Sequence, residues 1–288
     1  MRIDAHHHLW DLKAVHYPWL MAKGEVRFFG DPAAIASDYL IADFTKDAKA
    51  NGFAASVHIQ VGAQDGLAEA RWVDHVAASS GWPMKQVAFC DLSAPDCEAN
   101  LDALCALPSV VGVRQIIGRA PGEDAVTGTQ ELLQSPAFRQ GLVMAQQRGL
   151  SFDLQLLPEL MGPVADLLAS VPDLPVALCH AGSPYDRSEA GIENWARQLS
   201  SLSSLPQVTA KLSGLGMFHH GWRSEDFRPL VDHVLNQFGP KRVMFGSNFP
   251  VCSLTSDYAT LVTAYQDLIP HEMQDQIFGL TAKAFYRF

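Results

Sequence analysis

The chain has 288 residues, 48% of them hydrophobic, and a formal net charge of −10 with a pI near 5.5. This acidic balance argues against a nucleic acid or an anionic membrane as partner, and no apolar run approaches the roughly 20 residues that span a bilayer. Residues 1–20 lack a signal-peptide pattern, and the five cysteines form no CxxC pair. We therefore expect a cytoplasmic protein with free thiols, large enough to bury one barrel-sized core.

The first predicted strand covers residues 2–8 and carries three adjacent histidines. Because side chains alternate along a strand, we expect Asp4, His6 and His8 to project to one face and His7 to the other. Two imidazoles at this spacing can share a metal ion or flank a substrate oxygen. A cloning remnant or a surface histidine cluster is the alternative, but the run leads directly into an apolar, aromatic stretch. We therefore assign His6 and His8 to a functional site.

Short β-rich runs alternate with longer amphipathic stretches through the rest of the chain. The predicted strands after the first cover residues 54–61, 86–92, 110–116, 151–156, 176–180, 208–213 and 242–248. Helical patterns lie between them at 67–80, 130–148, 159–170, 189–202, 224–238 and 256–268. Several strands are near-continuous apolar runs, as expected for parallel strands covered on both faces. Eight such units predict an α/β fold, a (β/α)8 TIM barrel forming a single domain over residues 1–288.

Polar residues stand near the C-terminal ends of the predicted strands, where the active site of such a barrel lies. They are His6, His8, His58, Gln60, Asp91, Arg114, Gln115, Asp153, Gln155, His180, Lys211, Ser213, Ser247 and Asn248. Four aromatic residues either line a pocket or belong to the core, namely Trp10, Tyr17, Trp19 and Trp222. The segment 17–39 is a long first loop of the kind that often covers the site.

Single members of this set also have structural explanations. A lone histidine such as His58 is as often a hydrogen-bonded core residue as a ligand. His180 follows an apolar run and precedes a turn, so we expect it at the barrel mouth. Arg114 and Lys211 suit an anionic or carbonyl-bearing substrate, but they can equally be structural counter-ions, with Asp153 as the partner of one of them.

Six segments carry a resemblance to a known superfamily. They are 3–12 (IDAHHHLWDL), 17–19 (YPW), 112–115 (GVRQ), 178–182 (LCHAG), 211–215 (KLSGL) and 244–251 (MFGSNFPV). In the right order over nearly the whole chain, they resemble the amidohydrolase superfamily, in the branch of fuconolactonase-like sugar lactonases and 2-pyrone-4,6-dicarboxylate lactonase. The resemblance implies a hydrolase that opens a small lactone, of the sugar-acid or of the pyrone or muconolactone type, by attack of an activated water.

The resemblance also implies roles for individual residues. His6, His8 and His180 match histidines that bind a catalytic metal or hydrogen-bond the substrate, so it implies either one divalent metal, with zinc favoured, or a metal-independent site. A metal would polarise the lactone carbonyl and activate its bound water. The implied catalytic residues are His180, Asn248 and Arg114, and Lys211 is an implied substrate-binding residue. From their places on or just after the predicted strands, we also expect Gln60, Gln155 and Trp10 to bind substrate.

The chain departs from the family pattern at Asn248, where the family usually has Asp. Neutral Asn takes no proton at neutral pH and adds no negative charge to a metal site. Three interpretations stay open: Asn248 donates a hydrogen bond while another group handles the proton, the site is metal-free, or the protein is a ligand-binding barrel that lost its base. A metal-dependent decarboxylase or amide hydrolase of the same superfamily is a further alternative, although decarboxylase relatives generally need the strand-eight carboxylate.

The choice of lactone is expected to depend on loops at the barrel mouth, namely 17–39, 118–129 and 183–191. Ring size and stereochemistry depend on where these loops place their side chains. Many barrels pair through their outer helices, so a homo-oligomer is a further expectation, although no patch in the sequence specifies one.

Overall fold

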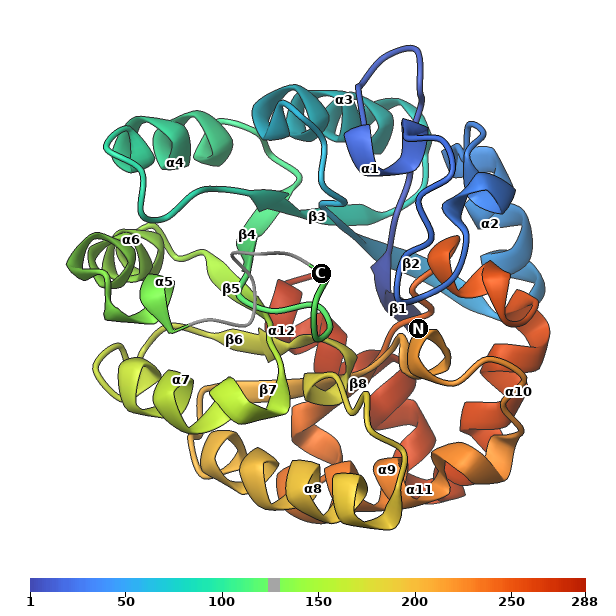
Figure 1. Ribbon diagram of the computed structural model, residues 1–288. Coiled ribbons are helices and arrows are strands. Elements are labelled where there is room, and N and C mark those ends of the chain that lie inside the picture. The colour runs from blue at the N-terminus through green and yellow to red at the C-terminus, as the bar shows by residue number, and fades with distance from the viewer. Residues whose placement is uncertain (124–129) are drawn as a thin grey trace.

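Eight parallel strands surrounded by helices form a TIM barrel, which confirms the α/β fold predicted from the sequence (Figure 1). The computed structural model describes residues 1–123 and 130–288, so residues 124–129 of the predicted specificity loop 118–129 lie outside the described residues. Hydrogen bonds join the strands in sequence order. The strands are β1 Arg2–His7, β2 Phe53–Ile59, β3 Met84–Phe89, β4 Val110–Ile116, β5 Ser151–Gln155, β6 Val176–Leu178, β7 Val208–Leu212 and β8 Val243–Phe245.

Twelve α-helices are assigned within the described residues. They are α1 Pro18–Met21, α2 Ile41–Ala50, α3 Gly66–Ser79, α4 Cys97–Cys105, α5 Glu131–Gln134, α6 Pro136–Gln147, α7 Met161–Leu168, α8 Glu189–Ser203, α9 Ser224–Phe238, α10 Tyr258–Leu268, α11 His271–Asp275 and α12 Thr281–Tyr286. The helix predicted at 130–148 is two helices, because Pro136 starts a new one and the Ser135 side chain caps it. No described helix has the length and apolarity needed to cross a membrane.

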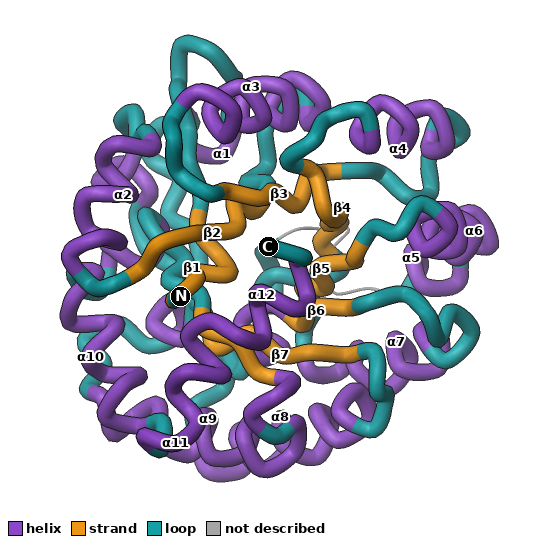
Figure 2. The backbone as a smooth tube through the Cα atoms, turned by 180° about the vertical axis from the view of Figure 1, so that it is seen from behind, coloured by secondary structure: helices purple, strands orange, loops and turns teal. Residues whose placement is uncertain are grey.

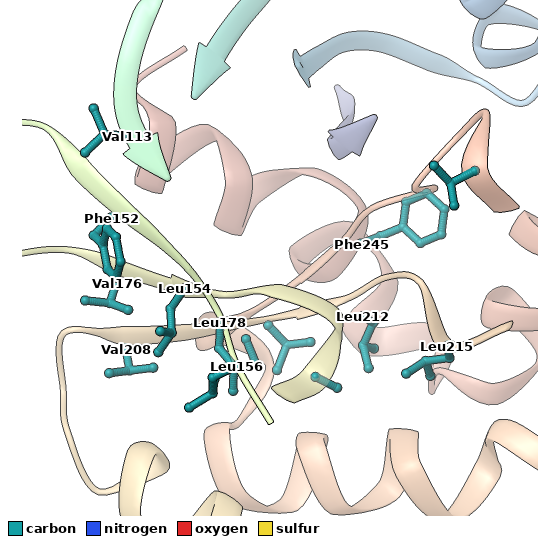
Figure 3. Packing of buried hydrophobic residues seen from close by; sticks show 14 of the residues in the cluster. Val113, Phe152, Leu154, Leu156, Val176, Leu178, Val208, Leu212, Leu215 and Phe245 are labelled. Carbon is teal, nitrogen blue, oxygen red and sulfur yellow. The ribbon is translucent and has the colours of Figure 1, made fainter. Parts of the chain in front are cut away.

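Two apolar layers hold the barrel together. Inside it, Ile3, Ala5, Val57 and Met244 pack with Tyr286 of α12, and α12 lies across the end of the barrel nearest the viewer in Figure 2. The outer layer lies between the strands and the surrounding helices, and Figure 3 shows part of it at β4 to β8. With one end filled by α12, the opposite end of the barrel is left for a site.

Seven of the eight strands end one to three residues before their predicted ends, and β4 alone ends where predicted. Residues just beyond the strand ends still form single backbone hydrogen bonds across the barrel. At the seam between β1 and β8, for example, the Asn248 N–H donates to the His6 carbonyl at 2.7 Å and the His8 N–H donates to the Phe249 carbonyl at 2.7 Å. These two bonds bring the ends of the first and last strands together.

A β-bulge in β1 changes the direction of its side chains. From Asp4 to His7, β1 advances by three residues, while its partner strand β2 advances by only two, from Ser56 to His58. Asp4 accepts hydrogen bonds from the Tyr258 hydroxyl of α10 at 2.9 Å and from the Ser247 N–H at 2.9 Å, on the helix side of the sheet. The expectation that Asp4 shares a face with His6 and His8 is therefore wrong, because strict alternation does not allow for the extra residue.

Candidate active site

A cavity of about 80 Å³ lies at the C-terminal ends of the strands. Its lining residues are His8, Trp19, Arg27, Phe28, Phe29, Val61, Gly62, Arg114, Ile116, Arg119, Gln155, His180, Met217, Asn248 and Val251. A larger surface groove of about 670 Å³ lies beside α3 and α4 and contains neither His8 nor His180. Since Trp19 and the run Arg27 to Phe29 belong to the long first loop, this loop covers the mouth as expected.

His8 is held in one orientation at the edge of this cavity. Its Nδ1 lies 2.7 Å from the Ile59 carbonyl oxygen, and because a carbonyl only accepts, Nδ1 carries the proton. Nε2 therefore carries a lone pair. Asn248 lies against it, with Oδ1 at 3.1 Å from Nε2 and Nδ2 near the Met217 and Cys252 sulfurs. A proton taken up at Nε2 would be donated to Asn248 Oδ1, so Nε2 is the basic atom here.

His180 lies in a short, strained turn directly after β6. It and the next three residues all have positive φ angles, which cost free energy for the non-glycine members. Ser213 fixes the ring, since its hydroxyl accepts from the His180 N–H at 3.2 Å and lies 3.0 Å from Nδ1. A Cβ at Gly214 would lie 2.5 Å from Nδ1, so only glycine fits there. His180 Nε2 has no partner among the described residues and is available to a ligand.

His6 lies between these two rings, with centroid distances of 5.1 Å to His8 and 4.6 Å to His180. Neither of its ring nitrogens has a partner among the described side chains. Burial lowers the pKa of all three rings, of His8 to about 4, and the nearby charges of Arg114 and Lys211 lower them further. All three are therefore neutral at pH 7.

Arg114 is buried beside this cluster, with 4% of its surface exposed. It donates to the Gln60 carbonyl at 3.1 Å and to the Gln155 side-chain oxygen. Its Nε has no partner, and no described carboxylate forms an ion pair with it. Gln155 itself lines the cavity. Arg114 and Gln155, which were predicted separately as site residues, therefore contact each other at the site.

Lys211 is placed differently from Arg114. Its ammonium group is fully buried and donates to the Asp153 carboxylate at 2.5 Å and to the Ala5 carbonyl at 2.8 Å. The Tyr286 hydroxyl donates to the same carboxylate at 3.0 Å, from α12 at the closed end of the barrel. Lys211 does not line the cavity. The structure places it as a counter-ion of Asp153, the alternative to its predicted contact with substrate.

The other two predicted substrate-binding residues lie at the margin of the site. Trp10 is fully buried, donates to the Ser37 carbonyl, and packs edge-on against Trp19, which itself lines the cavity. Gln60 lies beside the central cavity and lines an adjoining one. The geometry thus supports contact with a ligand for Trp19 more directly than for Trp10.

Sequence reasoning missed several cavity residues. Arg27, Phe28 and Phe29 come from the first loop, and Arg119 follows β4. Met217 and Val251 come from turns after β7 and β8. No strand pattern marks such positions, and Arg27 and Arg119 stand in loop stretches that carry other charged residues, so their charge does not single them out.

The described residues do not fit a preformed divalent-metal site. No three or more of their His, Cys, Asp and Glu side chains have the spacing to hold one ion. The three imidazoles come with no carboxylate, while Arg114 and Lys211 place positive charge near them. A divalent cation there would meet cationic neighbours without an anionic ligand. The metal role of His6, His8 and His180 stays a prediction that this geometry does not support.

A comparison with protein families gives a match to the amidohydrolase model over residues 3–288. The chain belongs to the amidohydrolase family. An uncharacterized protein of Sinorhizobium fredii, y4mH, is 35% identical over 99% of this chain and 98% of its own. An L-fucono-1,5-lactonase of Burkholderia multivorans is 28% identical over 90% of this chain and 85% of its own.

A solved amidohydrolase of Burkholderia multivorans has a similar structure. Its crystal form with bound HEPES has a TM-score of 0.85 and its form with bound zinc one of 0.84, each at 25% identity. Each match covers 100% of this chain and 99% of the other. These family relations place this amidohydrolase among lactonase-like hydrolases.

Proposed function

We propose that this amidohydrolase opens the ring of a small lactone at the barrel mouth. The observation that carries the proposal is a fixed, neutral His8 whose Nε2 lone pair lies at a cavity shared with Arg114 and His180. A proton acceptor and two hydrogen-bond donors around one small cavity suit attack of water on an ester carbonyl. The similarity to a protein named L-fucono-1,5-lactonase supports a lactone as substrate.

The first step is the addition of water to the lactone carbonyl carbon. The water oxygen forms the new C–O bond, and one water proton passes to His8 Nε2. The electron pair of the C=O bond moves to its oxygen, which Arg114 and the free ring nitrogen of His180 stabilise by hydrogen bonds in a site with little water. The buried charge of Arg114 has its largest effect on this oxyanion.

The second step breaks the ring. The electron pair of the oxyanion re-forms the C=O bond, and the bond between the carbonyl carbon and the ring oxygen breaks. The electron pair of the broken bond goes to the ring oxygen, which takes the proton from His8. Because the pKa of His8 is lowered to about 4, its protonated form gives up that proton readily. The new carboxylic acid ionises in solution, so each turnover releases one proton.

Asn248 acts as a positioning residue in this scheme. It does not accept the proton, but its amide lies against His8 Nε2 and limits where that lone pair points. His8 thereby takes the role that a strand-eight carboxylate has in the family pattern. Metal chemistry is not used in these steps, because the described donor set does not fit a metal site.

A pH-indicator screen against sugar lactones and pyrone carboxylates tests the proposal. We expect turnover of at least one lactone, with kcat/KM reduced at least about 100-fold in His8→Gln and in Arg114→Gln. His75→Gln, which changes an exposed histidine on α3, is the matched control and keeps full activity. No turnover across both panels, or an active His8→Gln variant, contradicts the proposal.

A further inference from the structure

One peptide group connects Arg114 to a buried acid outside the cavity. This group joins Gln60 to Val61, just beyond the end of β2. Its carbonyl accepts from Arg114 Nη1 at 3.1 Å, and its N–H donates to Glu69 Oε1 at 3.1 Å. Because a trans peptide is planar and its C=O and N–H point in opposite directions, Arg114 and Glu69 lie on opposite sides of it. The contact between the mouth and Glu69 therefore passes through a single rigid unit.

Glu69 approaches this peptide from the helical layer around the barrel. It belongs to the first turn of α3, which packs against β3, and 1% of its surface is exposed. The start of α3 is fixed by Asp65, whose side chain accepts from the Leu67 and Ala68 N–H groups. The Asp65 carbonyl accepts from the Glu69 N–H at 3.1 Å. Glu69 does not line the cavity, so any effect on the reaction must pass through other residues.

The same turn after β2 also holds the first loop in place. The Val61 carbonyl accepts from Trp19 Nε1 at 2.5 Å, and Trp19 lines the cavity. The next residue, Gly62, has a φ of 80°, and a Cβ there would lie 3.3 Å from the Trp19 ring. Glycine suits both the backbone conformation and the close approach. The turn that Glu69 contacts therefore places Arg114 and one wall of the cavity.

Glu69 contacts this turn without neutralising Arg114. The described partners of the Arg114 guanidinium are the Gln60 carbonyl and the Gln155 side chain. Burial raises the pKa of Glu69 to about 8, so at pH 7 most of this side chain is protonated and uncharged. A protonated carboxyl still accepts the Val61 N–H through its carbonyl oxygen. The charge that stabilises the oxyanion is therefore left in place.

We infer that Glu69 is a positioning residue for Arg114, on which it acts through the peptide group between Gln60 and Val61. This inference rests on the proposed lactone hydrolysis. Without the Glu69 oxygen, the Val61 N–H loses its partner and the peptide can turn, which moves the Gln60 carbonyl away from Arg114. A displaced guanidinium stabilises the oxyanion less, because this stabilisation depends on donors that are already in position.

Two variants of Glu69 separate its oxygen from its packing. At pH 7, Glu69→Gln keeps an acceptor for the Val61 N–H and should keep kcat within about twofold of wild type. Glu69→Leu fills a similar volume without an acceptor, so kcat for the best lactone should fall about 10-fold while KM stays within about twofold. Glu193→Leu, on the exposed surface of α8, is the matched control and should change neither. Urea unfolding checks that each variant is folded under the assay conditions.

A double-mutant cycle tests whether the effect passes through Arg114. If it does, the double variant Glu69→Leu, Arg114→Gln should have a kcat/KM within about twofold of Arg114→Gln alone. Two independent losses would multiply instead, and the double variant would be about 10-fold less active than Arg114→Gln. Such multiplication, or a Glu69→Leu variant with the kcat of wild type, overturns the inference and leaves lactone hydrolysis intact.

A measurement without substrate separates this inference from the proposed function. In ¹⁵N-labelled protein, the Nε–H resonance of Arg114 is assigned with Arg114→Gln and the indole N–H resonance of Trp19 with Trp19→Phe. Both resonances should shift in Glu69→Leu and stay in place in Glu69→Gln, because both side chains bond to the turn that Glu69 holds. If no lactone is hydrolysed, these shifts still support the placement of Arg114 by Glu69. Unchanged resonances in Glu69→Leu overturn it.

Discussion

Two cations are buried inside this barrel, and their surroundings differ. Inside the barrel, below the mouth, Lys211 is bonded to Asp153, which also accepts from Tyr286 of α12. At the mouth, Arg114 is bonded only to neutral oxygens and keeps one donor free. A compensated charge belongs to the stability of the fold, whereas an uncompensated one destabilises the empty protein and is retained where a ligand or transition state supplies the missing negative charge.

The largest expected effect on stability is at the ion pair of Lys211 and Asp153. Lys211→Met leaves the Asp153 carboxylate buried without its ion-pair partner and should reduce the free energy of unfolding by about 3–5 kcal/mol. Urea unfolding followed by circular dichroism measures this. The double variant Lys211→Met, Asp153→Asn should recover part of the loss. A change below about 1 kcal/mol in the single variant would remove the contrast between the two cations.

The largest expected effect on activity is at the mouth. Arg114→Gln removes the charge that stabilises the oxyanion, so kcat/KM for the best lactone should fall by about 10²–10³, or about 2.7–4 kcal/mol of transition-state stabilisation. Steady-state proton release measures it. Arg139→Gln, which removes a charge from the exposed surface of α6, is the control. An Arg114→Gln variant within fivefold of wild type would contradict the oxyanion role.

The protonation state of Glu69 tests the claim that Arg114 lacks a counter-ion, because an ionised Glu69 would offset the charge of Arg114. The pKa of Glu69 is raised from 4.5 to about 8, chiefly by burial. Above pH 4.5 the unfolded state loses this proton while the folded state keeps it, so stability falls as pH rises toward 8. Glu69→Gln abolishes this loss, and its stability gain over wild type should grow by up to about 1.4 kcal/mol per pH unit between pH 4.5 and 8.

Thermal or urea unfolding at pH 5, 6.5 and 8 checks this dependence. Gln keeps an oxygen that can accept from the Val61 N–H, as Glu69 does at 3.1 Å. A flat or reversed difference would show that Glu69 is ionised at neutral pH and offsets Arg114.

The smallest expected effect is that of Tyr286→Phe, which tests whether a change near the closed end of the barrel leaves activity at the mouth unchanged. Tyr286→Phe removes a hydroxyl that donates to Asp153 and should cost about 1–3 kcal/mol of stability. Because α12 lies at the closed end, kcat/KM should stay within about twofold of wild type. A loss of activity larger than the loss of folded protein would contradict this prediction, because it would show that Tyr286 affects the active site.

The barrel and the position of its mouth were accessible from sequence because apolar strands ended repeatedly in polar residues. His8, Arg114, Gln155, His180 and Asn248 do line one cavity. The different environments of Arg114 and Lys211 were not accessible, because both residues follow the same pattern on their strands. Their difference depends on α12, which brings Tyr286 to the closed end from a segment far along the chain.

The directions in which the β1 side chains point could not be predicted from the sequence either. An alternating pattern carries no sign of a bulge, so Asp4 was placed on the wrong face. The cavity residues of the first loop depend on how that loop folds back over the strands. Arg27, for example, is positioned by an ion pair with Glu123, almost a hundred residues away in the chain.

The most direct test of the central claim is the free energy of unfolding of Arg114→Gln without ligand, measured beside its kcat/KM. If the charge of Arg114 is uncompensated in the empty protein, the variant should be as stable as wild type or more stable, while its activity is lost. A destabilisation of about 3 kcal/mol or more, like that expected for Lys211→Met, would contradict the account by showing that Arg114 already has its partner within the fold.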